Sequence, residues 1–371
     1  MIPLFIISLG FGVFAQAQPS DTSAVPNRDH SSARAVDSTG ASENNADWLL
    51  LPFASYAPET KLSGGLVVGY YRPERPDGAA SSVQATVTIT QKRQLIAGVA
   101  PELYLDGGRW RVQGTVQAAH FPDSFYGVGG DTPARAEEGY TSRYVLLDGT
   151  AQRRVGANLR AGPRLFMRAA TVTDPDRGGL IDRKRVPGAD GGITAGLGGS
   201  VFWDARNSLY DPTTGSYGEV VATLHSAAWG SDYTFGRLKT DLRGYHPVGP
   251  GVLAGQVYTE AVAGTAPFEL LPLLGGSNRM RGYRKGRLRD NVYWATQVEY
   301  RLPLFWRFKG TAFAGWGEVG PRLGSPLVDD VEAAVGVGGR LRLTEDGVHG
   351  RLDLAYSRTG VELYVSLGEA F

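Results

Sequence analysis

From Trp48 to its last residue, the chain is dominated by segments in which apolar and polar residues alternate. The segment 83–90 is one example, where Val83, Ala85, Val87 and Ile89 alternate with Gln84, Thr86, Thr88 and Thr90. Successive side chains of a β-strand point to opposite faces, so a period of two predicts strands with one apolar and one polar face. The alternation therefore predicts an all-β fold.

Two all-β architectures have strands of this kind. A soluble sandwich turns its apolar faces inward, whereas a membrane barrel turns them toward lipid and its polar faces toward a wet lumen. The expected strands run for about 9 to 14 residues, which is longer than in most globular proteins and near the length that a tilted spanning strand needs. Short connections such as 106–108 also alternate with long ones such as 265–290, which is typical of periplasmic and outer connections. We therefore predict an antiparallel transmembrane barrel, with the sandwich as the alternative.

Sixteen strands fit the pattern, an even number that returns both chain ends to the periplasm. They are expected at 48–57, 61–71, 81–91, 95–106, 109–121, 140–153, 157–170, 191–204, 215–229, 233–246, 251–264, 291–302, 307–319, 330–343, 349–358 and 360–371. Pro52 and Pro58 make the first strand the weakest, which fits a seam with incomplete hydrogen bonding.

The N-terminal residues have a different composition from the rest of the chain. Residues 1–14 are almost wholly apolar and are followed by Ala-Gln-Ala, so we expect a signal peptide at 1–17. Residues 18–47 are rich in Ser, Asp, Asn and Ala and have few large apolar groups, which predicts a disordered periplasmic linker. The barrel is expected over 48–371.

The composition argues against several classes of function. With 38 basic and 37 acidic residues, the chain offers no net attraction to nucleic acid, and without cysteine it has no thiolate nucleophile, disulfide or thiolate zinc site. There is no Gly-x-Ser-x-Gly elbow. No metal-ligand spacing relates the five histidines, His30, His120, His225, His246 and His349. We therefore expect neither an enzyme nor a cofactor or metal.

One motif in the second half is specific. The stretch LGGSNRMRGY at 274–283 is followed by Asp290 and by QVEYRLPL at 297–304. This pattern resembles the barrel domain of the BamA/TamA superfamily, also called bacterial surface antigens, whose members assemble or translocate proteins at outer membranes. The resemblance extends from about residue 48 to the end, and we do not expect the POTRA repeats of the full-length assembly factors in this chain.

The resemblance implies an outer loop that folds back into the lumen at the tripeptide Arg281-Gly282-Tyr283. A guanidinium is a forked donor that suits a carboxylate, and Glu299 points inward on the next strand by alternation, so we predict an Arg281–Glu299 pair. A solvated charge in a basic loop is the alternative. Family members often have an inward aspartate where this chain has Gly315, so we expect Glu299 to serve alone.

Two further sets of residues resemble family features. A periplasmic turn motif is expected at Asp204, Arg206, Pro212 and Gly215. An assembly signal is expected at the end of the chain, with one face of the last strand formed by Leu363, Val365, Leu367 and Phe371.

The resemblance implies a function in the insertion or translocation of proteins, or of lipid, at the cell outer membrane, by a monomer or homodimer. The implied partners are outer-membrane lipid and either a client protein or a separate periplasmic partner. In the family, the seam between the first and last strands pairs weakly and is proposed to open toward lipid. A passive or loop-plugged pore, and a structural barrel whose outer loops engage surface partners, remain as alternatives.

Overall fold

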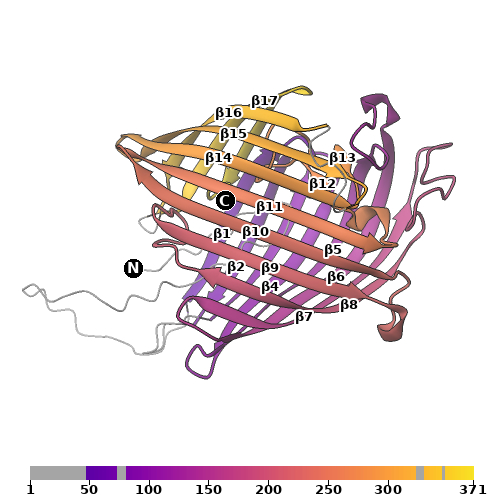
Figure 1. Cartoon of the computed structure of the whole chain (residues 1–371), viewed down its shortest axis with the longest axis horizontal. Helices are drawn as coiled ribbons and strands as arrows, with labels where there is room; N and C mark the ends of the chain where they lie inside the picture. The colour runs from indigo at the N-terminus through magenta and orange to yellow at the C-terminus, as the bar shows by residue number, and fades with distance from the viewer. Residues whose placement is uncertain (1–46, 73–80, 323–329, 345–346) are drawn as a thin grey trace, which may run out of the picture.

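Sixteen long strands close into one antiparallel barrel in the computed structural model, which describes residues 47–72, 81–322, 330–344 and 347–371 (Figure 1). The first eight are β1 (Asp47–Ala57), β2 (Lys61–Tyr71), β3 (Ser82–Thr90), β4 (Leu95–Leu105), β5 (Trp110–Phe125), β6 (Glu138–Arg154), β7 (Leu159–Thr173) and β8 (Gly191–Asp204). The other eight are β9 (Gly215–His225), β10 (Phe235–Val248), β11 (Gly251–Gly264), β14 (Val292–Phe305), β15 (Phe308–Gly320), β16 (Glu332–Arg342), β17 (His349–Ser357) and β18 (Gly360–Leu367).

Each strand pairs with its neighbours in chain order, and β1 pairs with β18 to close the barrel. Strand β11 pairs directly with β14, because β12 (Leu273–Leu274) and β13 (Leu288–Arg289) form a separate small hairpin inside the intervening loop. Three short 3-10 helices lie in outer connections: η1 (Ala134–Ala136), η2 (Ala227–Trp229) and η3 (Phe268–Leu270). The prediction of a sixteen-stranded barrel is confirmed, and the sandwich alternative is wrong.

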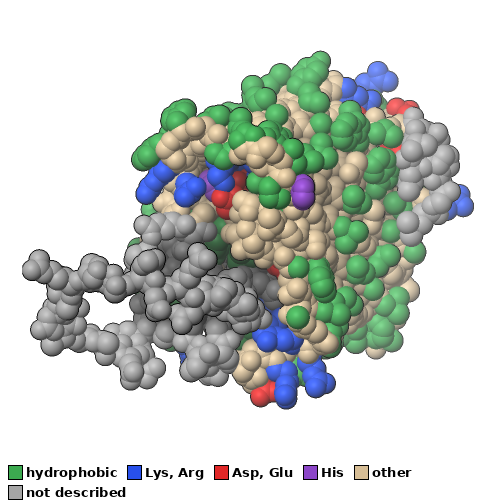
Figure 2. Space-filling view, turned by 60° about the vertical axis from the view of Figure 1, so that its left-hand side comes forward, with side chains coloured by type: hydrophobic (Ala, Val, Ile, Leu, Met, Phe, Trp, Pro, Cys, Tyr) green, Lys and Arg blue, Asp and Glu red, His purple; other side chains and the backbone are tan. Residues whose placement is uncertain are grey.

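The alternation in sequence becomes an alternation of exposure. On β3, Val87 and Ile89 are 50% and 63% exposed, whereas Gln84 and Thr88 point into the barrel and are buried. Hydrophobic side chains spread over the visible barrel wall, and charged ones gather mainly at its ends (Figure 2). Exposed apolar side chains on this scale suit hydrocarbon and not water.

Aromatic side chains mark the periplasmic end of the wall. Trp48, Trp110, Trp203 and Trp306 are all exposed, and each lies at or beside the end of a strand on this side. Such a girdle is typical of the membrane–water interface, where an amphipathic ring contacts both phases. Within the described residues, no helix is both long and apolar enough to cross a membrane.

The interior holds many polar and charged side chains beside its apolar clusters. Arg111, Arg340 and Asp353 point inward and are completely buried. Buried charges are stable only when they are paired or hydrogen-bonded, so the interior is organised by ion pairs. The long loop between β11 and β14 supplies partners for many of them.

The last strand ends earlier than expected. Strand β18 stops at Leu367, and Gly368, with φ 79°, turns the chain inward. Leu363 is still exposed on the outer wall, but Phe371 is buried and packs inside against Tyr245 and Ala254. The expectation that Phe371 shares a face with the strand residues is therefore wrong, because a left-handed glycine interrupts the period of two.

The expected signal peptide at 1–17 and linker at 18–47 fall, apart from Asp47, outside the described residues. Asp47 itself begins β1, so the first strand starts one residue before its expected position.

Candidate functional site

The outer loop 265–291 leaves β11, enters the barrel and returns to β14. Its path is shaped by Gly275 and Gly276, whose φ angles of 101° and 114° are rarely adopted by residues with a side chain. The amide of Gly276 donates to the carbonyl of Tyr283 over 3.0 Å, which closes the segment between them into a compact turn. This turn carries the Arg281-Gly282-Tyr283 tripeptide against the inner wall.

Gly282 brings the loop backbone into direct contact with the wall. Its amide donates to the hydroxyl oxygen of Tyr364 (3.0 Å), and its carbonyl accepts from the hydroxyl of Ser357 (2.6 Å). A Cβ atom at Gly282 would lie 3.2 Å from the Cβ atoms of both Ala334 and Ser357, and φ is 111°. Both the conformation and the close approach therefore favour glycine.

Tyr283 anchors the loop on the other side of Gly282. Its hydroxyl donates to Glu332 over 2.5 Å, and its carbonyl accepts from the Tyr364 hydroxyl over 3.1 Å. The side chain is 1% exposed and belongs to an apolar cluster that includes Leu274 and Met280 of the loop. Burying a large apolar side chain contributes about 1.5 to 3 kcal/mol, so this cluster and the hydrogen bonds hold the loop together.

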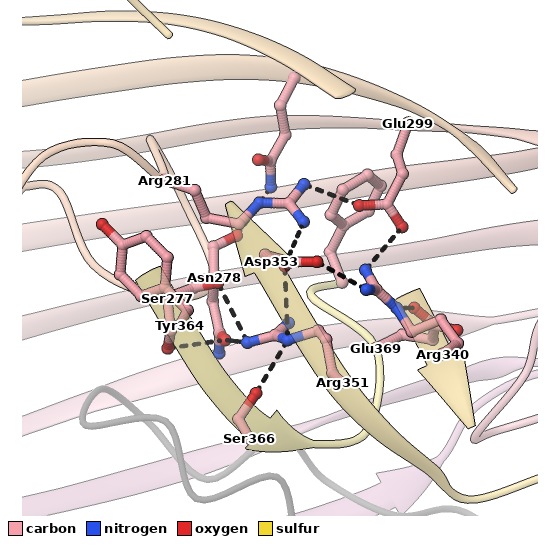
Figure 3. A network of polar contacts seen from close by, with 12 residues as sticks. Ser277, Asn278, Arg281, Glu299, Arg340, Arg351, Asp353, Tyr364, Ser366 and Glu369 are labelled. Carbon is pink, nitrogen blue, oxygen red and sulfur yellow. Dashed lines mark hydrogen bonds and ion pairs between the residues drawn. The ribbon is translucent and has the colours of Figure 1, made fainter. Parts of the chain in front are cut away.

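Arg281 lies between two carboxylates (Figure 3). Its Nη2 atom is 2.7 Å from Glu299 on β14, and its Nη1 atom is 2.7 Å from Asp353 on β17. The guanidinium carbon lies 3.5 Å from the centroid of the Phe313 ring, which adds a cation–π contact. The structure brings Arg281 and Glu299 together, but the expectation that Glu299 serves alone is wrong, because Asp353 provides a second carboxylate.

The pair is part of a larger buried network. Glu299 also accepts from Arg301 (2.9 Å) and Arg340 (3.4 Å), and Arg340 in turn pairs with Asp353 at 2.6 Å. Glu369, beyond the last strand, accepts from Arg340 at 2.8 Å. These contacts connect the loop, three strands of the wall and the C-terminal tail.

Arg351 joins the network to the loop backbone. Its Nη2 atom donates to the carbonyl of Ser277 (3.1 Å), and its Nε atom donates to the hydroxyl of Ser366 (2.8 Å), as Figure 3 shows. Desolvating charges is expensive, and a buried pair stabilises only when its geometry satisfies both partners. Since each carboxylate here lies against guanidinium groups, the arrangement acts chemically as a clamp on the loop.

Arg281 is only 1% exposed, so the solvated-loop alternative is wrong, and several other basic residues of the loop also have partners. Arg284 pairs with Asp123 at 2.7 Å, and Arg287 donates to the carbonyl of Thr132 at 2.8 Å. Arg279 stacks on Tyr258, with its guanidinium carbon 3.8 Å from the ring centroid. On one side the loop contacts β5 and the outer connection that follows it. On the other side it contacts β16, β17 and β18.

The periplasmic turn 205–214 is shaped by its four predicted residues. Asp204 accepts from Nε and Nη2 of Arg206 (2.9 and 2.7 Å), which is a bidentate pair. Gly215 has φ 99°, and a Cβ there would lie 2.1 Å from the carbonyl of Ala205. Pro212 is buried within the turn.

The C-terminal residues divide into two groups. Leu363 faces outward, and Val365 and Leu367 are partly exposed. Phe371 contributes its backbone oxygen, which accepts from Arg301 at 3.0 Å, and its ring, which lies 5.5 Å from that guanidinium. The tail is therefore part of the inner network and does not extend the outer wall.

Asp353 and Arg340 lie at inward positions of their strands, but the sequence does not identify them as neighbours of the loop. The family pattern pointed to the position of Gly315, where a Cβ would lie 3.5 Å from the sulfur of Met280. A Cβ there would be in ordinary van der Waals contact with the loop, and the second carboxylate comes instead from Asp353 on β17. The only sequence signal for this role of Asp353 is its place among the alternating residues of its strand that face inward.

An apolar outer wall, an aromatic girdle and a loop clamped in a charged lumen define an outer-membrane β-barrel protein. The Omp85 superfamily domain matches residues 77–371. The chain therefore belongs to the Omp85 superfamily and is located in the outer membrane. No curated protein sequence matches the chain.

Solved structures share the fold at low sequence identity. BamA from Haemophilus ducreyi lacking POTRA domains 1–3 is 14% identical with a TM-score of 0.64, over 87% of this chain and 70% of that one. CdiB from Acinetobacter baumannii is 10% identical with a TM-score of 0.55, over 87% and 65%. CdiB from Escherichia coli is 12% identical with a TM-score of 0.57, over 86% and 63%. The chain thus spans about two thirds of the length of these proteins.

Proposed function

We propose that this chain inserts or translocates a client, either a protein or a lipid, at the outer membrane, and that the seam between β1 and β18 is the place where the client engages. The superfamily membership and the likeness of the barrel to BamA and CdiB support this class of function. The observation that carries the proposal is the shortness of the seam.

The seam is the weakest junction among the described strands. Strands β1 and β18 are registered only at Tyr56 and Val365, whereas β1 and β2 pair along their whole length, from Asp47–Tyr71 to Ala57–Lys61. Every other pair of neighbouring barrel strands has an extended register. An unpaired strand edge is a template for a new strand.

The C-terminal tail contributes to the open edge. An antiparallel continuation of the Tyr56–Val365 register would place residues 369–371 opposite 52–50. The inward turn at Gly368 removes them from that position, and Pro52 has no amide hydrogen to donate. The periplasmic part of β1, around residues 50–52, therefore offers backbone groups with which an incoming strand can pair.

The proposal is tested by photo-crosslinking in the native cells. A photoreactive residue at Leu50 samples the lipid face beside the open edge, and the matched control is Leu253, an exposed leucine near the start of β11, which is paired on both sides. We expect adducts with a polypeptide or a lipid carrier at Leu50 that exceed those at Leu253. Equal labelling at the two positions would contradict a client site at the seam.

Locking the seam provides a second test. Because the chain has no cysteine, Tyr56→Cys together with Val365→Cys adds a single disulfide across the seam. Oxidised protein should lose the Leu50 adducts, and reduction should restore them. Persistence of the adducts in the locked barrel would show that opening of the seam is not required.

A passive or loop-plugged pore is the second candidate function. The charged lumen supports it, because many of the buried polar side chains are arginines and carboxylates. Conductance in planar bilayers separates a passive pore from a barrel that the loop blocks. A large, steady conductance that is unchanged by Arg281→Ala would favour the pore.

A further inference from the structure

Three side chains from distant parts of the sequence meet at the periplasmic end of the barrel. Asp211 lies in the turn between β8 and β9, His349 is the first residue of β17, and Glu369 follows β18. One ligand atom from each lies within 4.8 Å of the others. The network that clamps the loop uses Glu369 but neither Asp211 nor His349.

The imidazole of His349 has no hydrogen-bonding partner among the described residues. The residue is 0% exposed, and neither ring nitrogen makes a hydrogen bond. Nε2 lies 4.0 Å from Asp211 Oδ2, and Nδ1 lies 3.7 Å from Glu369 Oε1, which is too far for a hydrogen bond. A buried polar group without a partner is costly, so a ligand that satisfies the ring would stabilise this arrangement.

The two carboxylates also have coordination capacity. Glu369 uses Oε2 to accept from Arg340, and within the part of the chain that the structure describes its buried Oε1 has no hydrogen-bond partner. Asp211 pairs through Oδ2 with Lys309, and its side chain is 17% exposed, so solvent reaches one of the three ligands.

We propose that Asp211, His349 and Glu369 bind a divalent transition-metal ion of the zinc class. One imidazole nitrogen and two carboxylate oxygens form a donor set that suits such ions, whereas magnesium and calcium prefer oxygen ligands alone. Bonds of about 2.1 Å place tetrahedral donor atoms about 3.4 Å apart. The three donor atoms lie within 4.8 Å of one another, so they move closer by up to about 1.4 Å when the ion binds, and water completes the shell.

Lys309 is the competitor for the site. Its ammonium group pairs with Asp211 and occupies the position of a cation beside the carboxylate. Binding of a metal displaces this ammonium group from Asp211. Removing the charge of Lys309 therefore strengthens binding of the metal ion. If the Lys309–Asp211 pair has only a structural role, the same change breaks the pair and does not strengthen metal binding.

A bound ion would connect the β8–β9 turn and the start of β17 to the C-terminal tail. The tail is the segment that turns away from β1 at Gly368. This role is independent of the identity of the client, and binding is measured without any assay of insertion or translocation.

The test is a titration of purified, folded full-length protein without a histidine tag with Zn²⁺, monitored by calorimetry, with Mg²⁺ as the control ion. We expect one Zn²⁺ per chain, at least about 10-fold weaker binding in His349→Gln and tighter binding in Lys309→Met. Zinc X-ray absorption should show one nitrogen and several oxygen ligands. His246→Gln is the matched control, because His246 is exposed on the outside of β10 near the same end.

Several outcomes would overturn the proposal. These are Zn²⁺ binding that is unchanged in His349→Gln, binding that is lost in His246→Gln, or an absorption spectrum without a nitrogen ligand. If His349→Gln does not fold, Asp211→Asn provides the same test from the exposed turn, and unchanged binding in that variant would also contradict the site.

Discussion

Arg281 and Asp353 are separated by 72 positions in the chain, yet the Nη1 atom of the first donates a 2.7 Å hydrogen bond to Oδ2 of the second. Both side chains are completely buried. Together with Glu299, Asp353 makes the guanidinium a bridge between β14 and β17. A loop that arises between β11 and β14 is thereby fixed to strands on both sides of β15 and β16.

Removing Arg281 should destabilise the folded barrel. Arg281→Ala leaves Arg340 as the remaining donor that Glu299 and Asp353 share. Loss of one partner of a shielded pair costs about 3 to 5 kcal/mol, less where lumen water screens the charges. We expect the heat-resistant folded form on a semi-native gel to unfold at a lower temperature. Glu299→Ala should have an effect in the same direction.

The double variant Arg281→Ala/Glu299→Ala gives the coupling between the two residues. We expect its loss of stability to be smaller than the sum of the two single losses, because neither charge remains buried without the other. If both single variants and the double variant migrate and melt like the parent, the pairing is not important for stability.

Asp353 should matter as much as Glu299. Asp353→Asn keeps the size of the side chain but removes the charge that faces Arg281 and Arg340. We expect a decrease in melting temperature similar to that of Glu299→Gln, measured by the same gel or by circular dichroism. A wild-type melting temperature for Asp353→Asn, with a decrease for Glu299→Gln, would mean that Glu299 alone holds the loop.

A methyl group at Gly282 should displace the loop. Gly282→Ala forces a left-handed φ on alanine and brings its Cβ to 3.2 Å from two wall atoms, at a cost of about 1 to 3 kcal/mol. The matched control is Gly255→Ala on β11, where no atom lies within 4 Å of the added Cβ. Protease cleavage within 265–291 should increase only in Gly282→Ala, and equal cleavage in the two variants would contradict the close approach.

Conductance should report whether the loop blocks the lumen. Because Arg281 clamps the loop inside the barrel, we expect the parent protein to show small, erratic currents in planar bilayers. Arg281→Ala should increase them as the loop leaves the wall. Currents that are large in the parent protein and unchanged in Arg281→Ala would indicate a pore that the loop does not control.

Deleting Phe371 should impair insertion into the membrane. The deletion removes the ring that packs on Tyr245 and the backbone oxygen that accepts from Arg301. Phe371→Ala is the milder comparison, because it keeps the backbone oxygen. The fraction of heat-modifiable protein in the membrane is the measurement, and normal insertion of the truncated chain would argue against a role of the tail in assembly.

The local features of the fold could be read from the sequence. The alternation placed all sixteen strands, and three of them, 61–71, 191–204 and 251–264, have the expected bounds. The inward positions of Arg340 on β16 and of Arg351 and Asp353 on β17 follow the same alternation. This works because the direction of a side chain along a strand depends only on parity, which needs no knowledge of the rest of the molecule.

What the sequence by itself determined is therefore which residues form strands, which face each residue occupies and which loop carries the tripeptide. Only the tertiary structure decided that Asp353 completes the clamp, that Phe371 turns inward and that Asp211, His349 and Glu369 meet. The physical reason is that partners across a lumen are set by the closure and register of the whole barrel. No local pattern encodes a distance between strands that are far apart in the chain.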